Sequence, residues 1–397
     1  MKKIHLIFCS FIPVGLEDYV NYFINHFDNF TYLKLKSHPI KKQYSSLIKY
    51  DRGRKTSEKY LFSITSSQNK YLYFLMLPFN YSIYLYQILT LFRKRENENK
   101  VAFIGVNYFC TLAGILLKKI GSVDIVIYRV TDFFPLPVRG VYRYINRFFY
   151  VIDSFCLRNS DAIWFTTKGH IIGREKYGYF DRNRYNFKII PLGLDINKFV
   201  SKPVNEKSRY SLVYVGVISK YHMLDLIFDI INDLKKDFNN IRLNIIGNGP
   251  DENYYKKLAM TLNLSDNIVF YGFIQEGTIL TALMTDNILG LALYRNEENF
   301  MKYTEPAKVK FYLGYGIPAI ISKVPLIAEE LNEKKICFSV NNNKDEIVRV
   351  IKNFILDKKL QREYKKNICK YVKTINTNEL LDNVIGETFK DLHIIVS

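Results

Sequence analysis

The residues best suited to chemistry lie between positions 303 and 322, where the sequence predicts a short helix. Thr304 can cap this helix, and Pro306 is tolerated in its first turn, because the first N–H groups of a helix have no intrahelical partner. Lys308 then stands in the first turn, beside amide donors and the positive end of the helix dipole. Amides, dipole and cation together suit a phosphate. A surface helix with a solvated lysine is the alternative.

The same helix has a face that can pack and a defined end. Tyr312 and Leu313 follow at helical spacing. Gly316 suits the left-handed position after a helix, and Pro318 prevents the helix from continuing. The apolar residues 319–321 predict a buried strand. The segment therefore predicts a helix packed in a core, with its N-terminus left for a ligand.

A second candidate group follows the predicted strand at residues 124–128. In a parallel sheet flanked by helices, ligands bind beyond the carboxyl ends of the strands. Asp132 is therefore a candidate general base or acceptor-orienting carboxylate, and Arg129 is its candidate partner. Asp132 as a turn or cap residue explains the position equally well. His170, after the next predicted strand, is a weaker candidate base.

Buried strands alternate with helices in both halves of the chain, which predicts an α/β fold with two Rossmann-like, doubly wound parallel sheets. A length of 397 residues also suits two domains. We place the first domain at 1–200, the second at 209–375 and a last, crossing helix at 376–397. The polar stretch 38–60 is predicted as a loop.

The glycines after strands are candidate ligand-binding turns. Gly247 begins the run Gly-Asn-Gly-Pro, which follows a predicted strand and precedes a helix, as phosphate loops do. Such a short glycine run is a weak signal. The five cysteines are scattered, without a Cys-x-x-Cys pair or a histidine cluster. They predict reduced core thiols, with no zinc site and no metal.

The charge and the aromatic residues suggest a surface for anionic partners. The formal net charge is +19, and residues 71–92 carry no charge over nearly the length of a membrane span. Pro78 predicts a loop inside this run, and its tyrosines favour an interface over a hydrocarbon core. Residues 139–158 mix arginines with tyrosines and phenylalanines, which fits an anionic membrane surface, a lipid-pyrophosphate acceptor or single-stranded nucleic acid. We expect a cytoplasmic protein, because no signal-peptide cleavage site follows the first residues.

Residues 303–322 resemble the donor-binding helix of GT-B glycosyltransferases of group 1 (family 4), whose pattern is Pro-x-Lys-φ-x-Glu-Tyr-φ-x-x-Gly-x-Pro-φ-φ with φ apolar. The matching residues are Pro306, Lys308, Val309, Tyr312, Leu313, Gly316, Pro318, Ala319 and Ile320. Phe311 replaces the Glu that holds the nucleotide ribose in many relatives. Glu305 lies near a Glu that contacts the donor sugar in such enzymes, with its register shifted. The resemblance implies a nucleotide-diphosphate site that includes Lys308, Glu305 and Tyr312.

The resemblance extends to other loops. The loop after residues 210–216 matches Gly-Arg-φ-x-x-x-Lys-Gly, which grips the donor diphosphate, but Val217 and His222 stand where the Arg and Lys would be. It implies that Gly216, with Ser219 or Lys220 as substitutes, contributes to the diphosphate site. It also implies that Ile274 lies in the loop that reads the nucleotide base, and that Gly15 faces the interdomain cleft.

We therefore expect a glycosyltransferase that uses a UDP- or GDP-linked sugar, with no cofactor, and acts on a saccharide or lipid-linked acceptor for a surface polysaccharide. The expected catalytic residues are Asp132, Lys308 and Glu305: Asp132 as the carboxylate that acts on the acceptor, Lys308 to stabilise the leaving diphosphate, and Glu305 at the donor sugar. The protein would lie on the inner face of the membrane. A catalytically weak binding protein of the same fold and a nucleotide-sugar 2-epimerase are the alternatives. A nucleic-acid binder ranks last, because no recognised motif for it is present.

Overall fold

The computed structural model describes residues 4–11, 16–36, 44–64, 70–95, 99–135, 142–196, 210–275, 277–295 and 300–394. The chain forms two compact units, Met1–Pro191 with Asn378–Ser397, and Leu192–Thr377. The first boundary, after Pro191, lies before the predicted boundary at residue 200, because Leu194 pairs with the residues at which the last helix begins. The Leu194 N–H donates to the Ile375 carbonyl (2.8 Å), and the Thr377 N–H donates to the Leu194 carbonyl (3.0 Å).

The first unit is built on an eight-stranded sheet with the order β4-β3-β2-β1-β5-β6-β7-β8. Six of its strands run parallel, as the alternation predicts, and β3 and β4 add an antiparallel hairpin to one edge. The strands are β1 (Ile4–Phe11), β2 (Asn29–Leu35), β3 (Ser45–Asp51), β4 (Arg54–Leu61), β5 (Lys100–Val106), β6 (Ile125–Val130), β7 (Ala162–Phe165) and β8 (Phe187–Ile189).

The β3–β4 hairpin corrects the prediction of a loop over residues 38–60; residues 37–43 lie outside the described part of the chain. Arg52 (φ 47°) and Gly53 (φ 78°) make the tight two-residue turn between the strands. Positive φ at both turn positions matches the twist of paired strands. Most side chains of β4 are exposed and charged or polar, so the segment has a loop-like composition. Its strand structure comes from pairing with β3.

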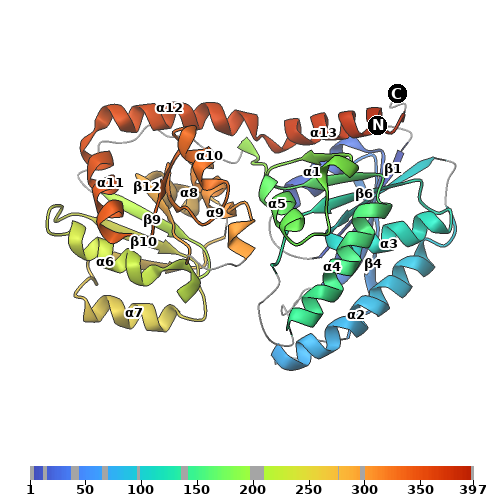
Figure 1. Cartoon of the computed structure of the whole chain (residues 1–397), viewed down its shortest axis with the longest axis horizontal. Helices are drawn as coiled ribbons and strands as arrows, with labels where there is room; N and C mark the ends of the chain where they lie inside the picture. The colour runs from blue at the N-terminus through green and yellow to red at the C-terminus, as the bar shows by residue number, and fades with distance from the viewer. Residues whose placement is uncertain are drawn as a thin grey trace. The chain divides into compact units, whose positions relative to one another are not determined.

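Helices cover both faces of this sheet (Figure 1). Core residues of α2, α3, α4 and α5 pack on one face, and those of α1 and α13 pack on the other. The last helix is fixed to the first unit by polar contacts as well, since the Trp164 indole donates to Thr388 Oγ1 (3.0 Å). The helices are α1 (Glu17–His26), α2 (Lys70–Leu91), α3 (Asn107–Lys119), α4 (Tyr142–Asn159), α5 (Lys168–Lys176) and α13 (Thr377–Asp391).

Helix α2 is continuous through Pro78, where the sequence predicts a loop. A proline inside a helix removes one hydrogen bond, and tertiary contacts of the helix compensate here. The Gln87 amide pairs with both backbone groups of Phe62, and Asn80 Oδ1 accepts from the Ile64 N–H. The polar residues Asn80 and Gln87, which interrupt the apolar run of α2, therefore hold the helix to the segment that follows β4. No helix in the described residues is long and apolar enough to cross a membrane.

The second unit contains a six-stranded parallel sheet with the order β11-β10-β9-β12-β13-β14. Helices α6, α7 and α11 pack on one face, and α8, α9, α10 and α12 pack on the other. The strands are β9 (Ser211–Val215), β10 (Arg242–Ile246), β11 (Ile268–Gly272), β12 (Leu289–Ala292), β13 (Ala319–Ser322) and β14 (Cys337–Val340). The helices are α6 (Leu224–Leu234), α7 (Glu252–Thr261), α8 (Thr278–Thr285), α9 (Ala307–Gly314), α10 (Ala328–Glu333), α11 (Lys344–Leu356) and α12 (Lys358–Thr374).

All five cysteines are free thiols. Cys9, Cys110, Cys156 and Cys337 are buried, as predicted for core thiols. Cys369 is exposed on α12, so the prediction is wrong for this residue. The buried side chains of α12, such as that of Ile368, pack in the core. Cys369 is the next residue along the helix, so its side chain points away from the core.

Candidate functional site

Lys308 lies in the first turn of α9 with its ammonium group buried and without a hydrogen-bond partner in the described residues. Its Nζ lies 4.3 Å from the ring centroid of Tyr214, on β9, and 5.4 Å from that of Tyr294, which follows β12. Burial lowers the pKa of Lys308 to about 7. The lysine is thus a buried group that gains charge readily when an anion arrives.

The glycine loops after β9 and β10 meet next to this lysine. Gly216 (φ 139°) and Gly247 (φ 134°) both have conformations that favour glycine. A Cβ at Gly216 would lie 3.4 Å from Lys308 Nζ, whereas one at Gly247 would lie only 2.0 Å from the Gly216 carbonyl oxygen. Gly216 therefore faces the cation, and the need for glycine at Gly247 comes from the close packing of the two loops. Sequence reasoning treated both as ligand contacts.

The loop after Gly216 supplies few charged groups near Lys308. His222 accepts or donates a hydrogen bond at Nδ1 with Ser219 Oγ (3.0 Å). Burial, together with the Lys308 charge, lowers the pKa of His222 to about 3, so the ring is neutral near pH 7. The side chain of Lys220 is exposed, and its backbone N–H donates to Asp251 Oδ2 (2.9 Å).

Glu305 is placed differently from a residue that touches a ligand. Its carboxylate is buried and forms an ion pair with Lys310 on α9, at 2.8 Å. Its second oxygen accepts a hydrogen bond from the Leu192 N–H (2.6 Å). Burial opposes the charge of Lys310, but Glu305 raises the pKa of its ammonium above the ordinary value. In this structure Glu305 therefore holds α9 to the segment that starts the second unit.

Three other predicted donor residues have the following positions. Tyr312 is buried, and its hydroxyl accepts from the Val215 N–H (2.9 Å) and donates to the Leu291 carbonyl (3.0 Å), so it anchors α9 to two strands. Thr304 lies before α9 and is not its cap. Pro306 occupies the N-cap position of the helix, and no side chain forms a capping hydrogen bond there. Ile274 is half-buried in the loop after β11 and packs against the α9 side of the core.

Asp132 lies after β6 and lines a cavity of about 460 Å³ in the first unit. Its Oδ2 accepts a hydrogen bond from Thr131 Oγ1 (2.9 Å). Although water reaches this side chain, the surrounding protein atoms raise the pKa of the carboxyl above its ordinary value; Thr131 and Arg174 partly offset this effect. A carboxylate at a cavity wall with such a shift suits a group that accepts a proton.

Beneath Asp132 lies a buried ion pair that sequence reasoning missed. Arg174 Nε donates to Asp153 Oδ2 (2.9 Å), and a second guanidinium nitrogen donates to the Asp132 carbonyl (3.3 Å). Burial disfavours the charge of Arg174, but Asp153 raises the pKa of the guanidinium above its ordinary value. Asp153 also accepts from the Tyr128 hydroxyl. The helix positions of Arg174 and Asp153 gave no sequence signal, because their pairing joins α4 and α5.

The predicted partner of Asp132 is incorrect. Arg129 is buried on the other side of the sheet, where its guanidinium donates to the Ile190 carbonyl (2.9 Å) and the Tyr19 hydroxyl (3.1 Å). Successive residues of a strand point to opposite faces of the sheet. Arg129 points to the face that α1 covers, whereas Asp132 lies two residues beyond the end of β6 and lines the cavity on the other face. His170 is fully buried, and burial together with Arg174 and Arg129 lowers its pKa. Gly15 lies outside the described residues.

The geometry therefore contains two separate sets of groups, each at the carboxyl ends of parallel strands. In the second unit, Lys308 and the glycine loops suit an anion. In the first unit, Asp132 lines a cavity large enough for a small molecule. Tyr214 and Tyr294, which enclose Lys308, were also missed; Tyr214 belongs to an apolar strand and Tyr294 follows one, and the role of both depends on where α9 packs. Metal-binding clusters of His, Cys, Asp and Glu are absent from the described residues.

Most of the second unit is similar to a known protein family. Residues 195–371 match the family model described as Glycosyl transferases group 1. A search of the curated proteins finds no match.

Solved structures with the same fold cover nearly the whole chain. HepE of Anabaena, in complex with UDP, has a TM-score of 0.68 and 11% identity over 98% of this chain and 100% of its own. Sucrose-phosphate synthase of Thermosynechococcus elongatus has a TM-score of 0.71 and 13% identity, over 98% of each chain. WaaG, a glycosyltransferase involved in lipopolysaccharide biosynthesis, has a TM-score of 0.62 and 13% identity, over 96% of this chain and 98% of its own. The predicted GT-B fold is confirmed.

Proposed function

We propose that this chain, whose residues 195–371 match the family model of the group 1 glycosyl transferases, moves a sugar from a nucleotide-diphosphate donor to a saccharide acceptor. The observation that carries the proposal is the buried ammonium of Lys308, which has no hydrogen-bond partner in the described residues and faces Gly216. A buried cation without a partner is unfavourable unless a ligand supplies the charge. The complexes of HepE with UDP and with UDP-glucose support a nucleotide-sugar donor.

Lys308 and the first amides of α9 would bind the donor diphosphate and stabilise it as it leaves. In the reaction, the acceptor hydroxyl oxygen bonds to the anomeric carbon, and the bond from that carbon to the diphosphate oxygen breaks. The bonding electron pair leaves with the diphosphate, where negative charge develops. Because a lysine and helix amides supply the positive charge, this mechanism needs no divalent cation, and turnover should persist in EDTA.

Asp132 would act on the acceptor. Its carboxylate accepts a hydrogen bond from the attacking hydroxyl and, in an inverting reaction, takes the hydroxyl proton. The raised pKa of this carboxyl favours the transfer, since it makes the carboxylate a stronger base. In a retaining reaction the same hydrogen bond orients the acceptor. Arg174 would keep Asp132 in place by its bond to the Asp132 carbonyl.

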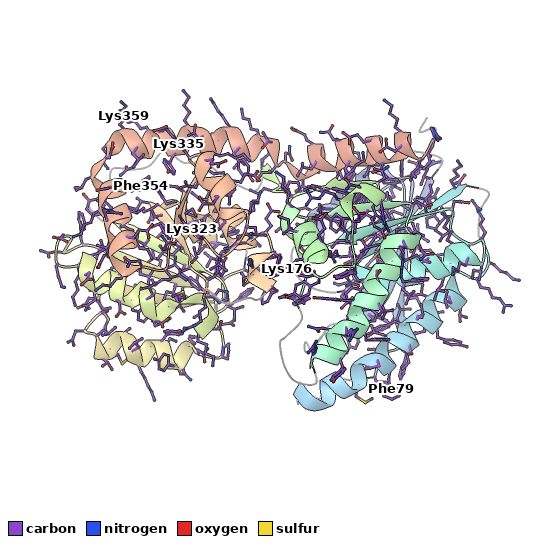
Figure 2. The ribbon with its side chains drawn as sticks, in the orientation of Figure 1. Phe79, Lys176, Lys323, Lys335, Phe354 and Lys359 are labelled. Carbon is purple, nitrogen blue, oxygen red and sulfur yellow. The ribbon has the colours of Figure 1, made fainter. Side chains whose placement is uncertain are left out.

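The surface of the first unit supports a lipid-linked acceptor at an anionic membrane. Helices α2 and α4 carry large aromatic side chains that are more than half exposed, namely Phe79, Tyr86, Tyr144 and Phe148. Figure 2 shows Phe79 projecting from α2. The exposed Arg143 and Arg147 lie one turn apart on α4. Aromatic and basic side chains together bind the interface of an anionic bilayer.

The test is nucleotide release from UDP- and GDP-linked sugars in the presence of anionic liposomes. One donor should be turned over, and Lys308→Ala should lower the turnover by about 10²–10³. Lys359→Ala is the matched control, because Lys359 is an exposed lysine of the same unit (Figure 2). Sedimentation with the liposomes tests the membrane surface separately, since a protein that stays in the supernatant contradicts only that part.

A catalytically weak binding protein is the second candidate, and the neutral His222 favours it. The loop after β9 offers an exposed valine and a neutral imidazole where relatives place two cations. This reading predicts saturable nucleotide binding without sugar release. Turnover of any donor by the native chain would exclude it.

A further inference from the structure

The first unit contains a second, larger cavity beside the one that Asp132 lines. Its volume is about 630 Å³, and it lies among α2, α3 and α4, which run together on one face of the sheet (Figure 1). Both volumes lie in the range of small-molecule sites. The two cavities share Tyr81, Phe109, Asn146 and Phe149 as lining residues. They are therefore neighbours on two sides of the same side chains.

The two cavities differ in polarity. The larger one is lined by aliphatic and aromatic residues such as Leu85, Ile88, Leu112 and Ile152, and none of the described residues that line it is charged. The polar groups at its wall have partners in the protein, since Ser82 Oγ donates to the Pro78 carbonyl (3.0 Å). The smaller cavity also has many aromatic rings in its wall, but it adds charged groups, namely Asp132, Asp153 and Arg174. A ligand that fills both cavities therefore needs polar groups only at the end that reaches these charges.

Aromatic rings form the boundary between the two cavities. Tyr81 stacks on Phe109 with ring centroids 3.9 Å apart, and Phe149 meets Phe109 edge-on at 5.7 Å. Asn146 Nδ2 contacts the Pro135 carbonyl at 3.5 Å, at the outer limit of a hydrogen bond. Tyr81 comes from α2, Phe109 from α3 and Phe149 from α4. A ligand that occupies both cavities must therefore pass these rings.

We propose that the larger cavity, defined by α2, α3 and α4, binds the hydrocarbon chain of the acceptor lipid while its saccharide end lies at Asp132. This inference rests on the proposed function. The wall that this cavity shares with the Asp132 cavity favours the acceptor's own chain over an unrelated lipid, because the saccharide end must reach the carboxylate. The exposed Arg143 and Arg147 on α4 suit the phosphate groups of a lipid or of the membrane around it.

The experiment measures binding of octyl, decyl and dodecyl glucoside to the full chain, below their micelle-forming concentrations, by displacement of the fluorescent fatty acid cis-parinaric acid. Affinity should rise roughly threefold to fourfold for each added methylene, as expected for burial of hydrocarbon. Ile152→Trp fills the cavity and should weaken dodecyl glucoside binding by roughly tenfold or more. Val151→Trp is the matched control, because Val151 is exposed on the same helix and does not line the cavity. This variant should bind dodecyl glucoside as tightly as the native chain.

A second variant tests the orientation of the ligand. Asp132→Asn should weaken binding of decyl glucoside and leave binding of 1-decanol unchanged, because only the saccharide reaches the carboxylate. Circular dichroism and thermal unfolding establish that each variant is folded. Equal affinity for all chain lengths, or equal weakening by the two tryptophan variants, would overturn the inference.

Nucleotide release measured on the same samples separates this inference from the proposed function. Donor turnover without chain-length dependence overturns only the apolar site. Chain-length dependence without donor turnover or nucleotide binding overturns the proposed function, and with it the assignment of the bound chain to an acceptor.

Discussion

Lys308 and Lys310 lie two residues apart on α9 and have opposite surroundings. Lys310 is buried against Glu305 (2.8 Å) and lies over the ring of Tyr371, and its pKa is raised. Lys308 is buried between Tyr214 and Tyr294, and its pKa is lowered to about 7. Both side chains belong to the same short helix, yet only Lys310 has a carboxylate and a hydroxyl of the protein as partners for its ammonium group.

The difference separates a structural cation from a candidate ligand-binding cation. A buried charge needs a counter-charge, and for Lys310 the protein provides it. For Lys308 the enclosing groups are aromatic rings, whose attraction for a cation is weaker than that of a carboxylate. The contrast also explains the position of Glu305, a predicted catalytic residue, because its carboxylate is the counter-charge of Lys310. The following predictions test this contrast, from the largest effect to the smallest.

Removal of one partner of the Lys310–Glu305 pair should have the largest effect. Lys310→Met leaves a buried carboxylate without its cation, which destabilises a protein by about 3–5 kcal/mol. The melting temperature of the full chain should fall by roughly 10 °C. The double variant Lys310→Met, Glu305→Leu should recover most of this loss. A calorimetric scan in which the single variant melts like the native chain would contradict a structural role.

Lys308→Met should lower turnover without lowering stability. Loss of one group that stabilises developing charge lowers kcat by about 10²–10³. The same change removes a poorly solvated ammonium, so the second unit should become more stable by about 1–3 kcal/mol. Nucleotide release and thermal unfolding of one sample measure both effects. A fall in the melting temperature similar to that of Lys310→Met would show that the two lysines have the same role.

Donor binding should depend on pH through Lys308. The pKa of this ammonium is lowered to about 7, so the cation is present below pH 7 and is lost as the pH rises. Affinity for a nucleoside diphosphate should therefore weaken by about tenfold between pH 6 and pH 8. Isothermal titration calorimetry at several pH values measures this. Lys308→Met is the control, because its remaining pH dependence belongs to the ligand. An equal slope in both proteins would refute the assignment.

His222 should have the smallest effect. Since its pKa is lowered to about 3, the ring is neutral throughout pH 5–8 and gives no charge to a diphosphate. His222→Gln should change donor affinity by roughly threefold or less, the effect of one neutral hydrogen bond. The pH profile of binding should keep its shape. A change of tenfold or more in the measured Kd would show that the ring carries charge in the complex.

The sequence by itself determined the alternation of strands and helices and the positions of the ligand-side loops. Buried parallel strands are apolar runs, and glycines mark the turns that follow them, so these signals are local. They suffice to place Asp132 and Gly216 at the ends of strands and Lys308 in the first turn of a helix. The resemblance of residues 303–322 to one family then indicated a function.

Only the tertiary structure decided which of these residues have partners in the protein. Glu305 meets Leu192, Arg129 meets Ile190, and Arg174 meets Asp153, each across a long sequence separation. Pairing with the neighbouring strand β3, which itself pairs with β2, likewise made β4 a strand. Such contacts depend on how helices and strands pack, and no local pattern encodes them. The charge state of Lys308 has the same origin, because burial between two distant tyrosines sets its pKa.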